Sequence, residues 1–176
     1  VGLGGVGLAA VLGAVAAGAE TVVAVDMFQQ KLDLALELGA THAFRADDPD
    51  VVAKVREATS GGVETALEFA GSVKALEFSY AITRRGGTTV TAGLPNPTAV
   101  LTLPAVSLVA EERTLKGSYL GSGVPSRDIP RFLGLYKRGK LPVDKLLTHR
   151  IALDDINEGF DRLASGEAIR QIVDFI

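Results

Sequence analysis

The sequence has 176 residues and a formal net charge of −3, from 18 basic and 21 acidic side chains that are well mixed along the chain. Hydrophobic residues make up 47% and charged residues 22%, an ordinary balance for a globular domain that can bury a core. No basic stripe points to nucleic acid, no apolar run is long enough to span a membrane, and the lack of cysteine excludes disulfides and thiolate zinc sites built from this chain.

The chain begins with Val1, which leads directly into a glycine loop at residues 2–7. We interpret this start as a truncation at the point where a first strand meets that loop. Such a strand belongs at the centre of a sheet, so its loss leaves two neighbours with unpaired N–H and C=O groups, each costing on the order of 1–3 kcal/mol when buried. We therefore expect either that the folded molecule contains more chain than this sequence, or that another segment or a partner fills the gap.

Hydrophobic periodicity and turn residues predict alternating helices and strands after the loop. The first eight expected elements are helix 6–17, strand 21–25, helix 29–38, strand 42–45, helix 49–59, strand 63–69, helix 73–83 and strand 88–92. A short helix 105–112, strand 114–120, helix 129–137, extended segment 145–153, helix 156–164 and extended segment 171–176 follow. Asp47 or Asp48 is expected to cap the third helix, with Pro49 at its first position.

Strands that alternate with helices across short connections indicate a parallel sheet with right-handed crossovers. The expected fold class is α/β, a doubly wound parallel sheet of the Rossmann type whose first strand is truncated. The 20 glycines agree with such a turn-rich chain better than with a helical bundle.

The loop sequence GLGGVG at residues 2–7 fits the motif G-x-G-x-x-G. Gly2 allows a tight turn, Gly4 lets a pyrophosphate approach the backbone, and Gly7 lets the helix pack close to the sheet. The helix that follows presents unpaired N–H groups and the positive end of its dipole to phosphates. The motif is weak alone, and the helix and strand that follow give it its specificity.

Asp26 ends the strand after this helix, 19 residues beyond Gly7. A carboxylate at this spacing accepts hydrogen bonds from the ribose hydroxyls of an adenosine and repels a 2′-phosphate, which favours NAD over NADP. The alternative is that Asp26 only caps the next helix.

Further short motifs are spread over the whole chain. They are VGLGGVGL (1–8), Val25-Asp26, Lys31, GAT (39–41), EFAG (68–71), AGLP (92–95), LKGS (115–118), INEGF (156–160) and SGEAIR (165–170). In this order they are similar to the coenzyme domain and tail of the zinc-type medium-chain alcohol dehydrogenases.

The resemblance implies a Rossmann domain at residues 1–119 and, at 120–176, a segment that belongs to the catalytic domain. It also implies NAD as cofactor, an alcohol or aldehyde as substrate, and hydride transfer to NAD. Zinc and its cysteine and histidine ligands belong to the N-terminal half of the family, which is not in this sequence, so we expect this chain alone to be inactive. No catalytic or metal-ligating residue is assigned to it.

The resemblance further implies roles for single residues. Asp26 and Lys31 contact the adenosine ribose, residues 93–95 line the nicotinamide pocket, the backbone N–H of Leu120 reaches the carboxamide, and Arg170 reaches the pyrophosphate. The full set of candidate cofactor-binding residues is Gly2, Gly4, Gly5, Val6, Gly7, Asp26, Lys31, Ala70, Gly93, Leu94, Leu120 and Arg170.

Simpler readings of several residues stay open. Lys31 is also consistent with a solvated lysine, and Arg170 with a surface ion pair to Glu167 or Asp174. His42 and His149 lie in distant segments and are expected to be ordinary residues near strand ends.

Two other functions remain open at this stage. One is a zinc-free quinone reductase of the medium-chain superfamily, which needs no cysteine but usually favours NADP. The other is a nucleotide-sensing module without catalysis. The resemblance also implies a homodimer that pairs through residues 99–120, and we expect a cytoplasmic protein.

Overall fold

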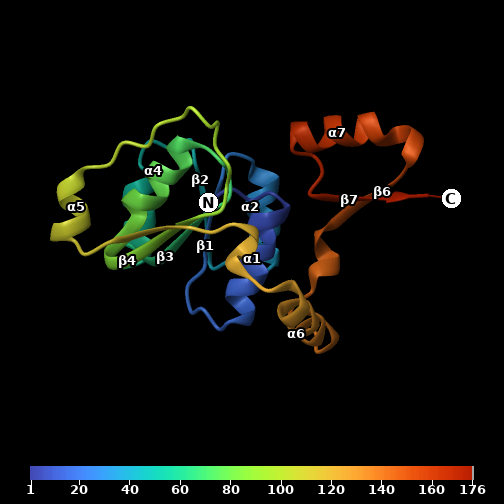
Figure 1. The fold of residues 1–176 in the computed structure, drawn as a ribbon, viewed down its shortest axis with the longest axis horizontal. Helices are drawn as coiled ribbons and strands as arrows, with labels where there is room; N and C mark the ends of the chain where they lie inside the picture. The colour runs from blue at the N-terminus through green and yellow to red at the C-terminus, as the bar shows by residue number, and fades with distance from the viewer. Residues whose placement is uncertain (176) are drawn as a thin grey trace.

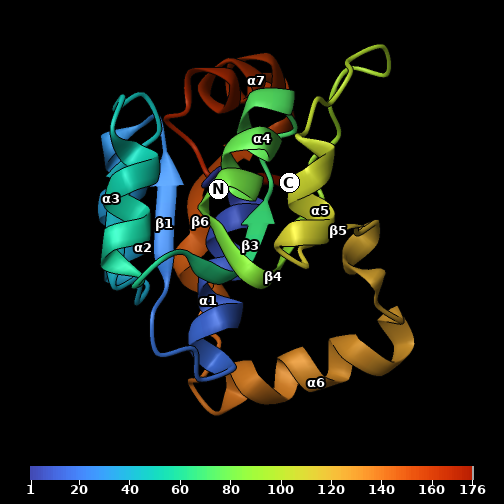
Figure 2. The same cartoon turned by 90° about the vertical axis from the view of Figure 1, so that its left-hand side faces the viewer.

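The computed structural model describes residues 1–175 (Figures 1 and 2). Its α-helices are α1 (Gly5–Ala16), α2 (Gln29–Glu37), α3 (Val51–Ala58), α4 (Val73–Ile82), α5 (Ala105–Ala110), α6 (Pro125–Lys137) and α7 (Ile156–Ser165). Its strands are β1 (Val23–Asp26), β2 (His42–Arg45), β3 (Val63–Glu68), β4 (Thr83–Thr91), β5 (Thr114–Gly117), β6 (Leu147–Ala152) and β7 (Arg170–Asp174). Short 3-10 turns are η1 (Leu120–Ser122), η2 (Val143–Leu146) and η3 (Leu153–Asp155). The strands pair in parallel throughout, as the alternation predicts.

The start of the chain joins two groups of strands. β1 pairs with β2, while β3, β4 and β5 pair in that order. The amino group of Val1 donates to the carbonyl of Leu67 at 2.8 Å, and the N–H of Phe69 donates to the carbonyl of Val1 at 2.9 Å. The N–H of Gly2 donates to the carbonyl of Val25 at 2.9 Å. Val1 and Gly2 thus bridge β1 and β3, in the spatial order β2, β1, Val1–Gly2, β3, β4, β5.

Beside the bridge formed by Val1 and Gly2, the space between β1 and β3 is a cavity of about 690 Å³. Val22 and Val23 line one side, and Val63 and Ala66 line the other. The expectation that another segment of the chain fills the position of the first strand is wrong for residues 1–175, because only the end of that position is occupied. The sheet is therefore interrupted between β1 and β3.

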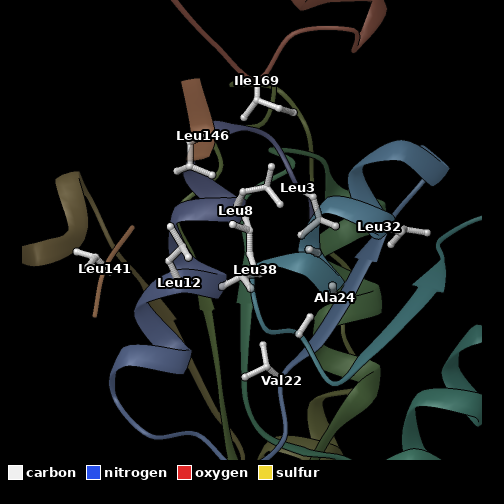
Figure 3. Packing of buried hydrophobic residues seen from close by; sticks show 13 residues of the cluster. Leu3, Leu8, Leu12, Val22, Ala24, Leu32, Leu38, Leu141, Leu146 and Ile169 are labelled. Atoms are coloured by element: carbon white, nitrogen blue, oxygen red, sulfur yellow. The ribbon is translucent and has the colours of Figure 1, made fainter. Parts of the chain in front are cut away.

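Helices cover both faces of the sheet. The larger core cluster lies where α1 and α2 pack on β1, and it also takes in Ile169 from near the C-terminus (Figure 3). The second cluster lies on the opposite face, where Val51 and Val55 of α3 pack with Ala66 and Ile82. Adjacent residues of β1 point to opposite faces, so Ala24 belongs to the first cluster and Val25 to the second. This is the expected doubly wound arrangement.

The third helix begins later than the sequence predicts. Asp50 is its N-cap residue, and neither Asp47 nor Asp48 caps it. The carboxylate of Asp48 instead accepts the N–H of Asp50 at 2.9 Å and pairs with Lys54. This local turn places Pro49 before the helix and not inside it.

Two other element starts differ from the expected residues by four or five positions. Helix α6 starts at Pro125, four residues before the expected start, because Pro125 fits the first helical position and Asp128 accepts the N–H of Val124 at 2.8 Å. Strand β4 starts at Thr83 and not at 88, with an irregular register against β3 that accommodates the glycine pair 86–87.

The C-terminal part forms a small unit of its own, in which α7 connects the parallel strands β6 and β7 (Figure 1). Leu146 and Ile169 anchor it to the larger core cluster. Arg150 and Asp174 pair across the two strands at 2.9 Å. The expected end of the last extended segment, Ile176, lies outside the described residues. No helix in residues 1–175 has the length and apolar character needed to cross a membrane.

Candidate functional site

Two of the three motif glycines in the loop lie in contacts that leave no room for a larger side chain. Gly2 has a φ of +83°, and a Cβ atom there would lie 2.6 Å from the backbone nitrogen of Ala70. A Cβ atom on Gly7 would lie 1.8 Å from the carbonyl oxygen of Gly2. At Gly4, by contrast, nothing lies within 4 Å of that position. The outer two glycines therefore allow packing, while the middle one borders open space.

This open space faces the start of α1. Gly4 is the N-cap residue, and no side chain caps the first turn or places an acidic group in it. Gly4 and Val6 are exposed, and Gly5 is half-buried. The first N–H groups of the helix, with the positive end of the helix dipole, are thus available to an anion.

Asp26 ties the end of β1 to the glycine loop. One carboxylate oxygen accepts the N–H of Leu3 at 2.6 Å, and the other accepts the N–H of Phe28 at 3.0 Å. Phe28 is the N-cap residue of α2, so Asp26 does support the start of that helix, as the simpler reading of this residue held. Each oxygen keeps a second lone pair, which leaves the carboxylate able to accept further hydrogen bonds.

Lys31, in the first turn of α2, lies against an aromatic ring. Its ammonium nitrogen is 4.7 Å from the ring centroid of Phe28, within the range of a cation–π interaction. Both side chains border Gly166, since its missing Cβ would lie 3.6 Å from the nearest atoms of each. The sequence reading of Lys31 did not include Phe28 or Gly166, which lack a local pattern pointing to this contact.

Arg170, the first residue of β7, reaches back to the glycine loop. Its Nε atom lies 2.7 Å from the position that a Cβ atom of Gly5 would occupy. Its guanidinium therefore lies at the start of α1, although the two residues are 165 positions apart. The alternative reading of Arg170 was a surface ion pair with Glu167 or Asp174. Within residues 1–175, Asp174 instead pairs with Arg150, and no ion pair joins Arg170 to Glu167.

The loops after β3 and β4 meet beside Gly2. A Cβ atom on Gly93 would lie 2.3 Å from the backbone nitrogen of Gly71, so these loops are in direct contact. Glu68, which is 1% exposed, holds them: one carboxylate oxygen accepts the N–H of Gly71 at 2.7 Å, and the other accepts the hydroxyl of Thr91 at 2.6 Å. Sequence reasoning missed Glu68 as a site residue, although an acidic residue directly after the apolar pair Ala66–Leu67 at the end of a strand was a usable signal.

Leu94 and Leu120 are highly exposed candidate residues, at 79% and 86%. Leu120 starts the turn η1 with a φ of +48° and makes no hydrogen bond to the other candidates in the described part of the chain. Its assigned role therefore stays a prediction. Most of the remaining candidates gather at the carboxyl ends of β1, β3 and β4, where ligands bind in open parallel sheets.

Residues 1–175 offer helix N–H groups, a carboxylate and a guanidinium that can bind a ligand. Within them, no group of three histidine, aspartate or glutamate side chains is arranged to hold a metal ion. His42 contacts the hydroxyl of Thr41 and stacks on Phe44, with 6.3 Å between ring centroids. The glycine loop, the Asp26 carboxylate and the Arg170 guanidinium are thus close together, as the sequence predicts for a dinucleotide site.

Comparison with known proteins places this arrangement in a family. Residues 5–138 match the family model described as zinc-binding dehydrogenase. The chain belongs to the zinc-binding dehydrogenase family. Solved structures of other proteins share its fold: the benzyl alcohol dehydrogenase of Acinetobacter calcoaceticus is 35% identical, with a TM-score of 0.94 over 98% of this chain and 47% of that one.

Sequence relatives of this chain are named as alcohol dehydrogenases or as a geraniol dehydrogenase. The NDMA-dependent alcohol dehydrogenase of Amycolatopsis methanolica is 41% identical over 98% of this chain and 47% of that protein. The geraniol dehydrogenase of Castellaniella defragrans is 40% identical over 99% of this chain and 47% of that protein. The chain thus spans about half the length of these relatives.

Proposed function

We propose that the chain is the NAD-binding part of an alcohol dehydrogenase. The observation that carries this proposal is the tie between Asp26 and the glycine loop, together with Arg170 lying at the start of α1. These groups offer a carboxylate to the adenosine ribose and a guanidinium to the pyrophosphate at one helix N-terminus. The names of the relatives support the same reading.

The residues present fit a dinucleotide in an extended pose. The open space beside Gly4 accepts a phosphate, since nothing lies within 4 Å of the position of its missing Cβ. Lys31 offers a second contact at the ribose. At the other end, Ala70, the 93–94 segment and Leu120 are assigned to the nicotinamide half. When bound, NAD supplies a hydride acceptor, and this chain's own residues hold and orient it.

The alcohol chemistry itself belongs to a larger protein. Residues 1–175 do not fit zinc, because no suitable ligand cluster exists among them and the sequence has no cysteine. In this proposal the whole protein oxidises an alcohol to an aldehyde or ketone, with zinc bound by residues outside this chain. The 176-residue chain alone binds NAD and is inactive. Residues 1–119 form the dinucleotide-binding domain, and residues 120–176 belong to the catalytic domain of a cytoplasmic enzyme.

Association through residues 99–120 is part of the proposal. Apolar side chains are exposed there, at 79% for Val100, 81% for Val109 and 73% for Tyr119. Exposed apolar side chains close together in the sequence favour an interface between copies. Light scattering at increasing concentration should report a dimer, and a monomer at all concentrations would contradict this part of the proposal.

Calorimetric titration of the chain with NAD and then NADP tests the function. Selective binding of NAD is expected, because the Asp26 carboxylate repels a 2′-phosphate. Binding of neither nucleotide would contradict the proposal for this chain. A preference for NADP would instead favour the zinc-free quinone reductase.

A further inference from the structure

The end of α7 lies against the helix that carries Lys31. Gly166 follows the last residue of α7 and adopts a left-handed conformation, with a φ of +80°. Its missing Cβ would lie 3.6 Å from Cε and Nζ of Lys31 and 3.6 Å from Cε2 of Phe28. The Lys31–Phe28 pair is therefore covered by a helix end that is 135 residues away from Lys31 in the sequence.

Two attractions act on the Lys31 ammonium at this point. It lies over the Phe28 ring at 4.7 Å, and it borders the carboxyl end of α7, where the helix dipole is negative. A free lysine side chain samples many rotamers, and fixing it costs conformational entropy. Contacts that restrict Lys31 in the absence of ligand reduce that cost when it binds a partner.

The segment after Gly166 is itself fixed to the core. Ala168 and Ile169 are buried, and Ile169 belongs to the cluster formed by α1, β1 and α2. The hydroxyl of Thr148 accepts the N–H of Ile169 at 3.1 Å and donates to the carbonyl of Arg170 at 2.9 Å. The turn from Gly166 to Arg170 thus has Lys31 at one end and the glycine loop at the other.

We propose that Gly166 is a positioning residue that holds Lys31 for the adenosine ribose of the nucleotide. The lack of a side chain lets the end of α7 approach Lys31 and Phe28, and the left-handed backbone turns the chain toward Arg170. This inference rests on the proposed NAD-binding function, and it adds a role for the C-terminal segment in binding the adenosine end of NAD.

The test is Gly166→Asn with Gly139→Asn as the matched control. Both glycines follow a helix and have positive φ values, +80° and +69°, and asparagine tolerates this conformation better than most residues. Nothing lies within 4 Å of a Cβ at Gly139, whereas at Gly166 the asparagine side chain extends toward Lys31 and Phe28. The free-energy cost of placing asparagine in a left-handed conformation is therefore similar in both variants, and only Gly166→Asn disturbs Lys31.

The first measurement needs no nucleotide. Acetylation of Lys31, followed by mass spectrometry with the exposed Lys74 as internal reference, should be faster by roughly threefold in Gly166→Asn because rotamer restriction is lost. It should be unchanged in Gly139→Asn. Equal Lys31 reactivity in all three proteins would overturn the contact that the proposal depends on.

The second measurement is a double-mutant cycle on binding of NAD and of AMP, which contains the adenosine ribose. Gly166→Asn and Lys31→Met should each weaken both ligands by roughly tenfold, and the double variant by little more than either. Additive losses, or equal losses in Gly139→Asn, would overturn the positioning role. Absence of NAD binding by the unaltered chain would instead refute the proposed function, and the acetylation rates would still decide whether Gly166 restrains Lys31.

Discussion

The Asp26 carboxylate accepts the N–H of Leu3 at 2.6 Å, so the acidic residue at the end of β1 directly shapes the glycine loop. In the sequence motif, the glycine loop and the acidic residue are two separate features that contact different parts of one ligand. In this structure they are one unit, because the same carboxylate also accepts the N–H of Phe28 at the start of α2. A change at Asp26 therefore affects the loop as well as the ribose contact.

Asp26→Asn should weaken NAD binding by roughly tenfold, because it removes the charge and replaces one acceptor oxygen with an N–H₂ group that cannot pair with a backbone N–H. NADP should lose less affinity, since the repulsion of its 2′-phosphate is also removed. Calorimetry with both nucleotides measures the ratio of the affinities for NAD and NADP in each variant. Glu37→Gln is the control, because it removes an exposed charge from α2; an equal change in both variants would contradict the role of Asp26.

Gly7→Ala should destabilise the fold by about 3 kcal/mol or more, since the new Cβ would lie 1.8 Å from the carbonyl oxygen of Gly2 and the backbone would have to move. Gly13→Ala lies in the same helix with nothing within 4 Å of its Cβ. It should stabilise by about 0.5–1 kcal/mol through helix propensity. Urea unfolding of both variants measures the difference, and similar stabilities would mean that the loop does not pack against α1 as described.

Glu68→Ala should cost about 2–4 kcal/mol, because it leaves the N–H of Gly71 and the hydroxyl of Thr91 without their acceptor. Glu68→Gln keeps the shape and one acceptor, so it should cost less. Glu64→Ala on the same strand is the matched control. Its side chain is 80% exposed and lies 3.5 Å from Arg84, so its loss should cost less than about 1 kcal/mol. Equal unfolding free energies for Glu68→Ala and Glu64→Ala would contradict the role of Glu68.

Much of the fold could be predicted because its signals are local. The β-branched strands and amphipathic helices from residue 21 to residue 92 follow hydrophobic periodicity, and parallel pairing follows from their alternation. The predicted start of α3 was wrong because the Asp48 carboxylate accepts the N–H of Asp50 in a turn before the helix, which then begins after Asp50 without a side-chain cap. This turn depends on backbone geometry that the residue pattern does not contain.

In the candidate site, too, some features have a local sequence signal and others depend on the folded chain. Asp26 and the glycine loop stand at a recognisable spacing, so they could be named from the sequence. The contact of Arg170 with Gly5 and the two bonds of Glu68 join segments that only the folded chain brings together. The cavity between β1 and β3 is likewise a property of the assembled sheet. The expectation that another segment of residues 1–175 fills it was wrong, because only Val1 and Gly2 occupy one end of that position.

The last prediction concerns pH and the amino group of Val1. Burial of this group lowers its pKa from 8.0 to about 6, although the negative charges of Glu68 and Asp26 act in the opposite direction. Between pH 6 and 8 the unfolded chain binds more protons at this amine than the folded chain, so the free energy of unfolding should rise with pH across this window. The gain should amount to about 2–3 kcal/mol, and it should be fully lost below pH 6, where both states are protonated.

Comparison of the 176-residue chain with its Nα-acetylated form isolates this effect. An acetylated Val1 keeps an N–H that donates to the carbonyl of Leu67 but carries no titrating charge, and the acetyl group can extend into the neighbouring cavity. Urea unfolding at pH 5.5, 7 and 8.5 should therefore give a smaller rise in stability for the acetylated chain, by about 2–3 kcal/mol. Parallel pH profiles for the two forms would show that the amino group is hydrated in the folded state and that Val1 does not sit between β1 and β3.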